Sequence, residues 1–320
     1  MNEYKISPII IVATALIVLG SLLFVITMSA CKWDFTALST QKQTNTHNIN
    51  QAFSNIEFDT DTTKITFVLT EDEACRVVCE DSKKLSHTVA VENQTLKVTS
   101  KTTKTFPSFF SFNHSVEVYL PKADYDELTI TSKTGDILIP AGLSFKGVSI
   151  TLTTGDVEFL ASATDYVQIK TSTGDIEIVG TNTALLNAEL STSTGDVSIQ
   201  NVACENTVAI TTSTGRQTLE NVTCKTLVST GTTGSVNLKN VIATESFNIT
   251  RDTGNVKFDG CDAQNVLVKT TTGDVKGTFL SEKIFFTKTT TGKVEVPKLT
   301  TGGVCDVTTT TGDIILSIAE

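Results

Sequence analysis

The sequence predicts an all-β protein, a parallel β-solenoid of about ten to eleven coils of roughly 20 residues each, preceded by one N-terminal transmembrane helix. Three observations predict it. A Thr-Gly pair recurs at almost constant spacing, apolar residues alternate on both sides of each pair, and a charge-free apolar stretch opens the chain. Composition agrees, because 57 of the 320 residues are threonine, a β-branched residue that favours strands over helices.

The N-terminal segment is predicted to be a membrane anchor. No charged side chain occurs between Lys5 and Lys32, and a helix over residues 6–30 would be about 37 Å long, enough to cross a hydrocarbon core of about 30 Å. This stretch is longer than the core of a cleaved signal peptide. We therefore expect residues 1–31 to be an uncleaved anchor with a cytoplasmic N-terminus. A lipoprotein stays open as the alternative, because Met-Ser-Ala before Cys31 resembles a processing site.

The next segments are expected to be a tether and a cap. Residues 32–50 are polar and without periodicity, which is typical of a tether. Residues 51–70 repeat the later alternation in degenerate form, with Thr63 at the place of the turn glycine. Residues 71–122 break the period and contain three strand-like runs, so they would cover the exposed edge of the first coil. We assign residues 51–126 to a degenerate first coil plus a β capping insertion.

Residues 127–320 are predicted to form the regular solenoid. Apolar residues return seven and five positions before each glycine and two and four positions after it, so each unit is a strand, a tight turn and a second strand. One unit cannot bury its apolar edge alone. The units must therefore stack, each strand pairing with its counterpart one repeat later. Glycine suits the turn because it adopts positive φ without strain. The structural turn residues are Gly135, Gly155, Gly174, Gly195, Gly215, Gly234, Gly254, Gly273, Gly292 and Gly312.

The repeated motif Thr-Gly-Asp resembles the family DUF4097, whose members carry the label "putative adhesin". The apolar N-terminal segment, followed by Trp33-Asp34-Phe35 and a polar tether, is similar to membrane-anchored Gram-positive members of that family. The resemblance covers nearly the whole chain. It implies a cell-envelope location with the solenoid outside the membrane, and a role in adhesion or envelope-stress signalling. It supplies no catalytic residues. Copies of the motif begin at Thr154, Thr173, Thr194, Thr272 and Thr311.

The acidic residues that follow several turn glycines are the candidate metal ligands. Stacked about 5 Å apart on successive coils, they offer the oxygen ligands that Ca²⁺ prefers. Asp is also an ordinary turn residue, and other residue types interrupt the column. We therefore expect no metal. The column carries Asp136, Asp156, Asp175 and Asp196, and the interruptions are Arg216, Ser235, Asn255 and Lys293.

The sequence predicts no enzyme and no cofactor. Paired carboxylates of the turn column could serve a carbohydrate-active enzyme, but these acids belong to the repeat, whereas an active site is a local departure from it. An acid and base pair outside the repeat would reverse this prediction. His47, His87 and His114 precede the regular coils, and no nucleophile elbow or metal-ligand spacing accompanies them. A formal charge of −10 excludes binding to the phosphate backbone of nucleic acid.

Seven cysteines cannot all pair within one chain. Cys204 and Cys224 occupy the same offset on adjacent coils, within disulfide range, and we favour reduced, stacked thiols over a bridge between them. Cys75 and Cys79 lie four residues apart on one predicted strand, about 13 Å, which is too far to bridge.

The aromatic segment of residues 106–112 is the weak candidate for a binding site. Its four rings could touch a partner or a membrane surface, or they could fold back over an end coil, which we favour. The residues are Phe106, Phe109, Phe110 and Phe112.

These observations predict a non-catalytic cell-envelope surface protein, an adhesin or binding scaffold that presents a Thr-rich β-solenoid outside a membrane crossed once. The expected partners are the membrane, through the N-terminal helix, and a cell-envelope polymer or a neighbouring membrane protein. The alternative is a regulatory component of an envelope-stress system that binds a membrane partner. A carbohydrate-active β-helix enzyme is the third hypothesis.

Overall fold

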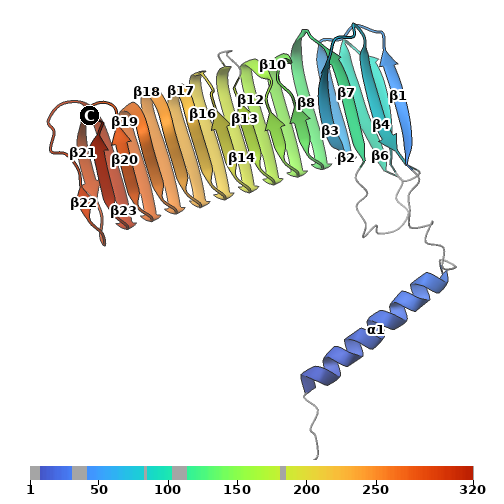
Figure 1. Cartoon of the computed structure of the whole chain (residues 1–320), viewed down its shortest axis with the longest axis horizontal. Helices are drawn as coiled ribbons and strands as arrows, with labels where there is room; N and C mark the ends of the chain where they lie inside the picture. Colours follow the sequence, from blue (N-terminus) through green and yellow to red (C-terminus); the bar gives the residue numbers. More distant parts are fainter. Residues whose placement is uncertain (1–7, 31–41, 83–84, 103–113, 181–184, 320) are drawn as a thin grey trace, which may run out of the picture.

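The computed structural model describes residues 8–30, 42–82, 85–102, 114–180 and 185–319. These residues form one helix and a long two-layered rod of stacked strands (Figure 1). Strands make up 73% of the structure, and the chain winds through about nine turns of a β-solenoid. The prediction of an all-β solenoid is therefore confirmed. The predicted count of ten to eleven coils is too high, because the coil around Gly292 is incomplete, with a second strand of only two residues.

Helix α1 spans Pro8–Ala30. Among the residues that the structure describes, no helix is long and apolar enough to cross a membrane, so the predicted transmembrane helix is not supported. The exposed large apolar side chains described in α1 lie between Leu16 and Ile26. Cys31, which the lipoprotein alternative would modify, and most of the predicted tether lie outside the described residues.

The N-terminal end of the rod is built by seven strands. Parallel pairs join β2 to β6 and β3 to β7, whereas β1–β4, β4–β7 and β5–β6 are antiparallel. The strands are β1 (Gln43–Ile49), β2 (Asn55–Thr62), β3 (Lys64–Thr70), β4 (Cys75–Asp81), β5 (Leu85–Glu92), β6 (Thr95–Thr102) and β7 (Ser115–Pro121).

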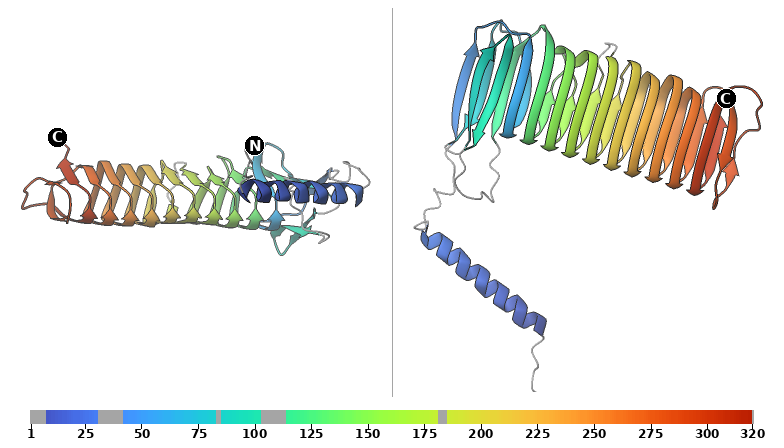
Figure 2. Two further views of the ribbon diagram at one scale, coloured as in Figure 1. Left: turned by 90° about the horizontal axis from the view of Figure 1, so that it is seen from below. Right: turned by 180° about the vertical axis from the view of Figure 1, so that it is seen from behind.

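The regular part of the rod has two layers of parallel strands (Figure 2). From β8 to β16 the strands of the two layers alternate along the chain, whereas β17, β18 and β19 each run through both layers. The strands are β8 (Asp124–Thr134), β9 (Ile137–Ile139), β10 (Ser144–Thr154), β11 (Val157–Phe159), β12 (Ser162–Thr173), β13 (Ile176–Val179), β14 (Leu185–Thr194), β15 (Val197–Gln200), β16 (Cys204–Thr214), β17 (Gln217–Thr233), β18 (Val236–Thr253), β19 (Val256–Thr272), β20 (Val275–Phe279), β21 (Lys283–Lys288), β22 (Val294–Glu295), β23 (Gly303–Thr311) and β24 (Ile314–Ile318).

The interior between the two sheets is the hydrophobic core. The four alternating positions predicted from the repeat point into it, so that in one coil Val148, Ile150, Val157 and Phe159 are each at most 2% exposed. Stacking coils about 4.8 Å apart places like residues over like residues, and each apolar column is thereby removed from water along the whole rod.

The turn glycines lie at φ between +132° and +158°, a region that side-chain-bearing residues rarely adopt. Close approach between coils adds a second requirement. A Cβ on Gly195 would lie 2.0 Å from the backbone oxygen of Gly174 in the coil below. Both the dihedral and the space therefore require glycine at this position.

The order of coils at the two ends differs from the order in the sequence. Strands β23 and β24, the last in the chain, pair with β19 and β20 on one side and with β21 and β22 on the other. At the opposite end, β2 and β3 form the first coil. Strand β2 lies between β8 and the later strand β6, and β3 lies between β9 and the later strand β7. The expectation that every strand pairs with its counterpart one repeat later is wrong at these ends. The arrangement leaves the shorter coil, β21 and β22, at the open edge of the stack. A long unpaired edge strand favours aggregation, and a short one limits it.

The six described cysteines are buried and unbridged, which confirms the interpretation of Cys204 and Cys224 as reduced thiols. Burial raises the pKa of the Cys224 thiol to about 12, so the thiolate that reacts in oxidation is rare at neutral pH.

Candidate functional site

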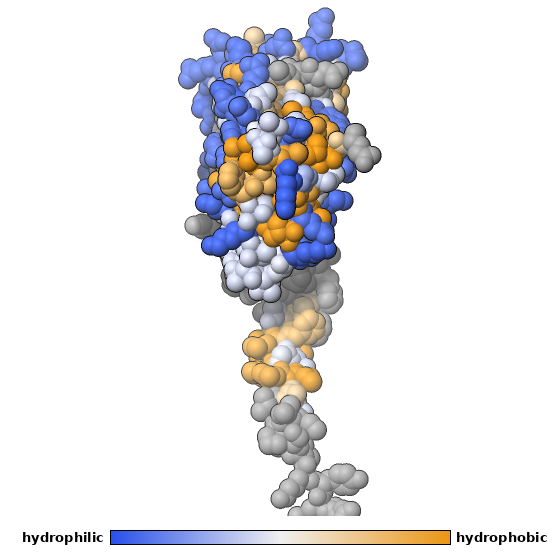
Figure 3. All heavy atoms as spheres, turned by 90° about the vertical axis from the view of Figure 1, so that its left-hand side faces the viewer, coloured by the Kyte–Doolittle hydropathy of each residue, from blue (hydrophilic) through white to orange (hydrophobic). Residues whose placement is uncertain are grey.

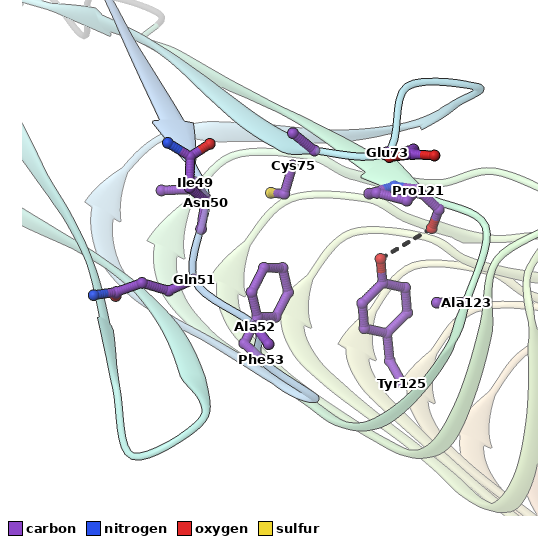
Figure 4. Close-up of a pocket in the computed structure, with 11 residues that line it drawn as sticks. Ile49, Asn50, Gln51, Ala52, Phe53, Glu73, Cys75, Pro121, Ala123 and Tyr125 are labelled. Carbon is purple, nitrogen blue, oxygen red and sulfur yellow. Dashed lines mark hydrogen bonds between the residues drawn. The ribbon is translucent and has the colours of Figure 1, made fainter.

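A pocket of about 480 Å³ opens at the N-terminal end of the solenoid (Figure 4). Apolar and aromatic side chains provide most of its lining, and polar groups occur on one part of it. The apolar lining consists of Ile49, Ala52, Phe53, Ala74, Cys75, Pro121, Ala123 and Tyr125, and the polar lining of Asn50, Gln51 and Glu73.

The pocket forms because the regular stacking stops at this end. After β1 ends at Ile49, residues 50–54 cross the end of the stack as an irregular segment. Hydrogen bonds hold that segment in place: the Ser54 N–H donates to the Gln94 carbonyl (3.0 Å), and the Ser54 carbonyl accepts from the Asp126 N–H (2.8 Å). Among the residues that the structure describes, no further coil fills the core beyond this segment, so apolar side chains line a space in place of a packed layer.

Three aromatic rings run from the pocket into the core. The rings of Phe53 and Tyr125 are stacked with centroids 6.0 Å apart, and those of Tyr125 and Phe145 are 5.8 Å apart. Figure 4 shows the Phe53 and Tyr125 rings side by side, with the Tyr125 hydroxyl donating to the Pro121 carbonyl (2.9 Å). The buried hydroxyl is thus satisfied within the protein. Tyr125 is only 4% exposed, so it is the partly exposed ring of Phe53 that offers surface to an apolar ligand.

The two buried titratable groups of the pocket, Tyr125 and Cys75, are neutral. Burial raises the pKa of the Tyr125 hydroxyl, and it raises the pKa of the Cys75 thiol to about 12. A protonated, buried thiol is a weak nucleophile. The pocket can therefore bind an apolar group but offers no activated side chain for chemistry.

A second cluster lies beside the first turn and has the hydrogen-bond order of a nucleophile, a base and an orienting acid. His87 Nδ1 lies 2.7 Å from Asp81 Oδ1, and His87 Nε2 lies 3.0 Å from Thr63 Oγ1. Asn45 Nδ2 donates to the other oxygen of the Asp81 carboxylate (2.5 Å). A small pocket of about 170 Å³, lined in part by Thr63 and His114, adjoins the cluster.

Burial argues against a catalytic role for this cluster. Thr63 is 1% exposed and the His87 side chain is fully buried, whereas a nucleophile must reach its substrate. The neighbouring backbone donors are also occupied, because the Thr63 N–H donates to the Thr134 carbonyl and the Lys64 N–H to the His114 carbonyl. These two groups are not available to stabilise an oxyanion. The cluster's hydrogen bonds give partners to the buried side chains of Thr63, His87 and Asp81, at the place where the column of turn glycines ends and Thr63 takes the glycine position.

The predicted acidic column is a hydrogen-bond ladder between coils. The Oδ1 atom of Asp156 accepts the backbone N–H of Asp175 (2.8 Å), and Asp175 accepts in turn from Asp196 (2.7 Å). Asp196 Oδ1 accepts the N–H of Arg216 (2.7 Å). The Arg216 side chain has no acceptor, so it cannot continue the ladder to the next coil. Within the described chain, no group of three or more His, Cys, Asp or Glu side chains could hold a metal ion.

A polar cluster that the sequence analysis missed lies inside the core. Arg251 is 1% exposed, and its Nη1 and Nη2 donate to Thr212 Oγ1 (3.0 Å) and Ser229 Oγ (3.3 Å). Gln217 is fully buried, donates to Thr212 Oγ1 (3.1 Å) and accepts from Ser229 Oγ (2.6 Å). The space for the guanidinium comes from Gly231, where a Cβ would lie 1.5 Å from Arg251 Nη1.

The Arg251 cluster had a detectable signal in the sequence. Gln217 stands two positions after a turn glycine, where the other regular coils carry Val or Ile. A column-by-column comparison of the repeats finds such departures. The pocket residues have no comparable signal, because they lie in the non-periodic N-terminal part. The weak candidates Phe106, Phe109, Phe110 and Phe112 lie outside the described residues.

Comparison with known proteins places the chain in a family. Among solved structures, a "putative adhesin" of Bacteroides fragilis is 12% identical, with a TM-score of 0.39 over 88% of this chain and 99% of that one. A "putative lipid binding protein" of Parabacteroides distasonis is 11% identical, with a TM-score of 0.43 over 88% and 98%. No functionally curated protein matches. The family model described as Toastrack DUF4097 matches residues 53–215 and 202–320, and the chain therefore belongs to that family.

Proposed function

We propose that the chain is a non-catalytic binding protein that takes an apolar, uncharged group of its ligand into the pocket at the N-terminal end of the solenoid. The pocket itself carries this proposal. Its volume of about 480 Å³ lies in the range of small-molecule sites, and stacked rings and aliphatic groups form its wall.

Charge restricts the ligand class further. Glu73, which is exposed, lines the pocket, and the whole chain carries a formal charge of −10. An anionic ligand group would be repelled by both, whereas an uncharged or cationic one would not. The expected ligand is a molecule with an apolar or aromatic end and no negative charge next to it.

Two fluorescent probes of similar shape test the proposal. N-phenyl-1-naphthylamine is uncharged, and 1-anilinonaphthalene-8-sulfonate is its anionic relative. Fluorescence titration of the full chain should show tighter binding of the uncharged probe. Ala123→Trp, which adds an indole to the pocket wall, should weaken this binding at least tenfold.

Ala141→Trp is the matched control, because Ala141 is exposed and does not line the pocket. The apolar side chains of α1 can also take up such probes, but α1 is the same in all three proteins. Only the signal that Ala123→Trp removes and Ala141→Trp retains belongs to the pocket. Equal binding by the three proteins, each shown to be folded by circular dichroism, would refute the proposal.

A second candidate function, adhesion through the flat face of the longer sheet, is supported by a ladder of hydroxyl groups. Four positions before the turn glycines, Thr or Ser occupies most coils, and the sheet register aligns these residues; in one step Thr211 Oγ1 and Thr230 Oγ1 are 3.1 Å apart. Such a face suits a polar polymer such as an envelope polysaccharide. The aligned residues are Thr131, Thr151, Lys170, Ser191, Thr211, Thr230, Thr250, Lys269 and Thr308.

Adhesion requires the solenoid to lie outside the cell, and we extend the proposal to that location. Protease added to intact cells should then remove a tag at the C-terminus, and full protection of the tag would contradict the location. Co-purification separates the two remaining roles. A polymer in the purified fraction supports adhesion, whereas a stoichiometric membrane protein supports the regulatory role in an envelope-stress system.

A further inference from the structure

The C-terminal end of the rod exposes apolar side chains. Outside α1, the described part of the chain has four exposed large apolar side chains, and all four lie at this end: Leu280, Phe286, Val294 and Val304 are 52%, 56%, 42% and 39% exposed. Figure 3 shows a hydrophobic patch framed by hydrophilic residues on this end face. Exposed patches of this kind mark interaction surfaces.

The same end carries open sheet edges. In the described chain, β21 pairs only with β23, and β22 only with β24, so the outer edge of each has no strand beside it. β21 spans six residues and β22 two. An unpaired edge next to exposed apolar side chains is a template for a further strand, and β21 is the longer of the two edges.

The residues around β21 form a pattern that is complementary to itself. Phe285 pairs with Cys305 and packs against the core, so the alternate residues Ile284, Phe286 and Lys288 share the opposite, outer face. Glu282, the residue before β21, is exposed, and one oxygen of its carboxylate accepts from Thr301 Oγ1 (2.6 Å). If two β21 strands pair antiparallel about Phe285, Lys288 lies opposite Glu282 of the second copy, and Phe286 lies opposite Ile284 of the second copy. Opposite charges and apolar residues then meet on one face.

Neighbouring registers lack this match. Pairing centred on Ile284 sets Lys288 opposite Leu280, and pairing centred on Phe286 sets Lys288 opposite Ile284. Charge complementarity therefore selects the register about Phe285 and selects a second copy of this chain as the occupant.

We infer that two copies of the chain join through their C-terminal ends, with antiparallel β21 strands centred on Phe285, into one continuous rod. The contact is two-fold symmetric, so it uses the open β21 edge of both copies and closes the assembly at two. Both exposed apolar end faces lie against each other in this dimer. The two N-terminal pockets then lie at opposite ends of the rod.

Charge reversal tests the dimer and its register together. Sedimentation equilibrium of the full chain in a mild detergent should give twice the chain mass of 34.3 kDa. Glu282→Lys places two like charges opposite each other, as does Lys288→Glu, and each should raise the dissociation constant at least tenfold. The double variant Glu282→Lys/Lys288→Glu exchanges the charges and should restore the dimer. Lys257→Glu, an exposed reversal on the side of the rod, should leave it unchanged.

Disulfide capture is the independent measurement. In a Cys31→Ser background, a mixture of the single variants Ile284→Cys and Phe286→Cys should form a covalent heterodimer under mild oxidation, faster than either variant alone. A monomeric wild-type chain, an assembly larger than a dimer, or a double charge variant no better than the single ones would overturn the inference. So would equal cross-linking in the mixture and in the separate variants.

Discussion

Arg251 permits a quantitative test of the buried polar cluster. Arg251→Met replaces the guanidinium by an apolar chain of similar length. The remaining polar groups keep partners, since Gln217 Nε2 still donates to Thr212 Oγ1 and Ser229 Oγ still donates to Gln217 Oε1. The substitution thus removes a buried charge without leaving its neighbours unsatisfied.

The magnitude follows from the pKa of Arg251. Burial lowers it from its ordinary value to about 10, and this shift corresponds to a cost of about 3 kcal/mol for the charged form in the folded state. Two hydrogen bonds to Thr212 and Ser229 return about 1 kcal/mol each. The Met side chain adds apolar burial in the core. We therefore expect Arg251→Met to increase the free energy of unfolding by about 1 to 3 kcal/mol.

The effect has a defined pH dependence. Above about pH 10 the unfolded chain holds the Arg251 proton more tightly than the folded chain, so wild-type stability rises with pH relative to the variant. The advantage of Arg251→Met should be constant from about pH 6 to 9 and should shrink from about pH 10 upward.

Thermal unfolding followed by circular dichroism measures the difference, with an expected rise in Tm of about 2 to 6 °C at pH 7. Arg216→Met is the matched control, because Arg216 is exposed, and its Tm should stay close to that of the wild type. A loss of more than about 1 kcal/mol in Arg251→Met would refute the reasoning, since it would mean that the guanidinium is compensated by a negative charge.

Three further predictions concern the turns, the acidic column and the thiols. Gly195→Ala should lower stability by more than about 2 kcal/mol, because its Cβ would lie 2.0 Å from the Gly174 oxygen, and a melting curve like that of the exposed Ser193→Ala control would contradict the turn geometry. EDTA should change Tm by less than about 2 °C, since the turn carboxylates accept backbone N–H groups; a drop of about 10 °C reversed by Ca²⁺ would show a calcium site. In a Cys31→Ser variant, Ellman's reagent should react slowly with the native protein and stoichiometrically after unfolding, because the six described thiols are buried; fast labelling of the native protein would contradict this burial.

The solenoid was predictable because one physical constraint repeats through the sequence. Each coil must place apolar side chains inward and glycine at the turn, so the period is visible without any structure. Pairing at the ends was not predictable, because neighbouring coils are so alike that either can lie beside β19. Only the connections between the strands decide which one does. The pocket was missed for the opposite reason, since its lining comes from segments that follow no period.

Side-chain roles were predicted in part. Asp156 and Asp175 were expected to act as turn residues, and the structure shows that their side-chain oxygens accept hydrogen bonds from the next coil rather than from their own turn. This contact links residues about 20 positions apart, so it depends on a stacking register that residue type alone does not specify. The apolar stretch at the N-terminus predicted a helix and its approximate length, but its predicted role in crossing the membrane is not supported.

The order of coils at the C-terminal end affects how the rod can be built. The segment around Gly292 is synthesised before the strands β23 and β24, yet it lies outside them in the finished stack. A rod growing one coil at a time from the N-terminus would place β21 and β22 directly on β19 and β20, in the site that the last coil must occupy. The end can be completed only after β23 and β24 have been synthesised. Premature docking of β21 would therefore be a specific kinetic trap, absent from a solenoid whose coils follow their order in the sequence.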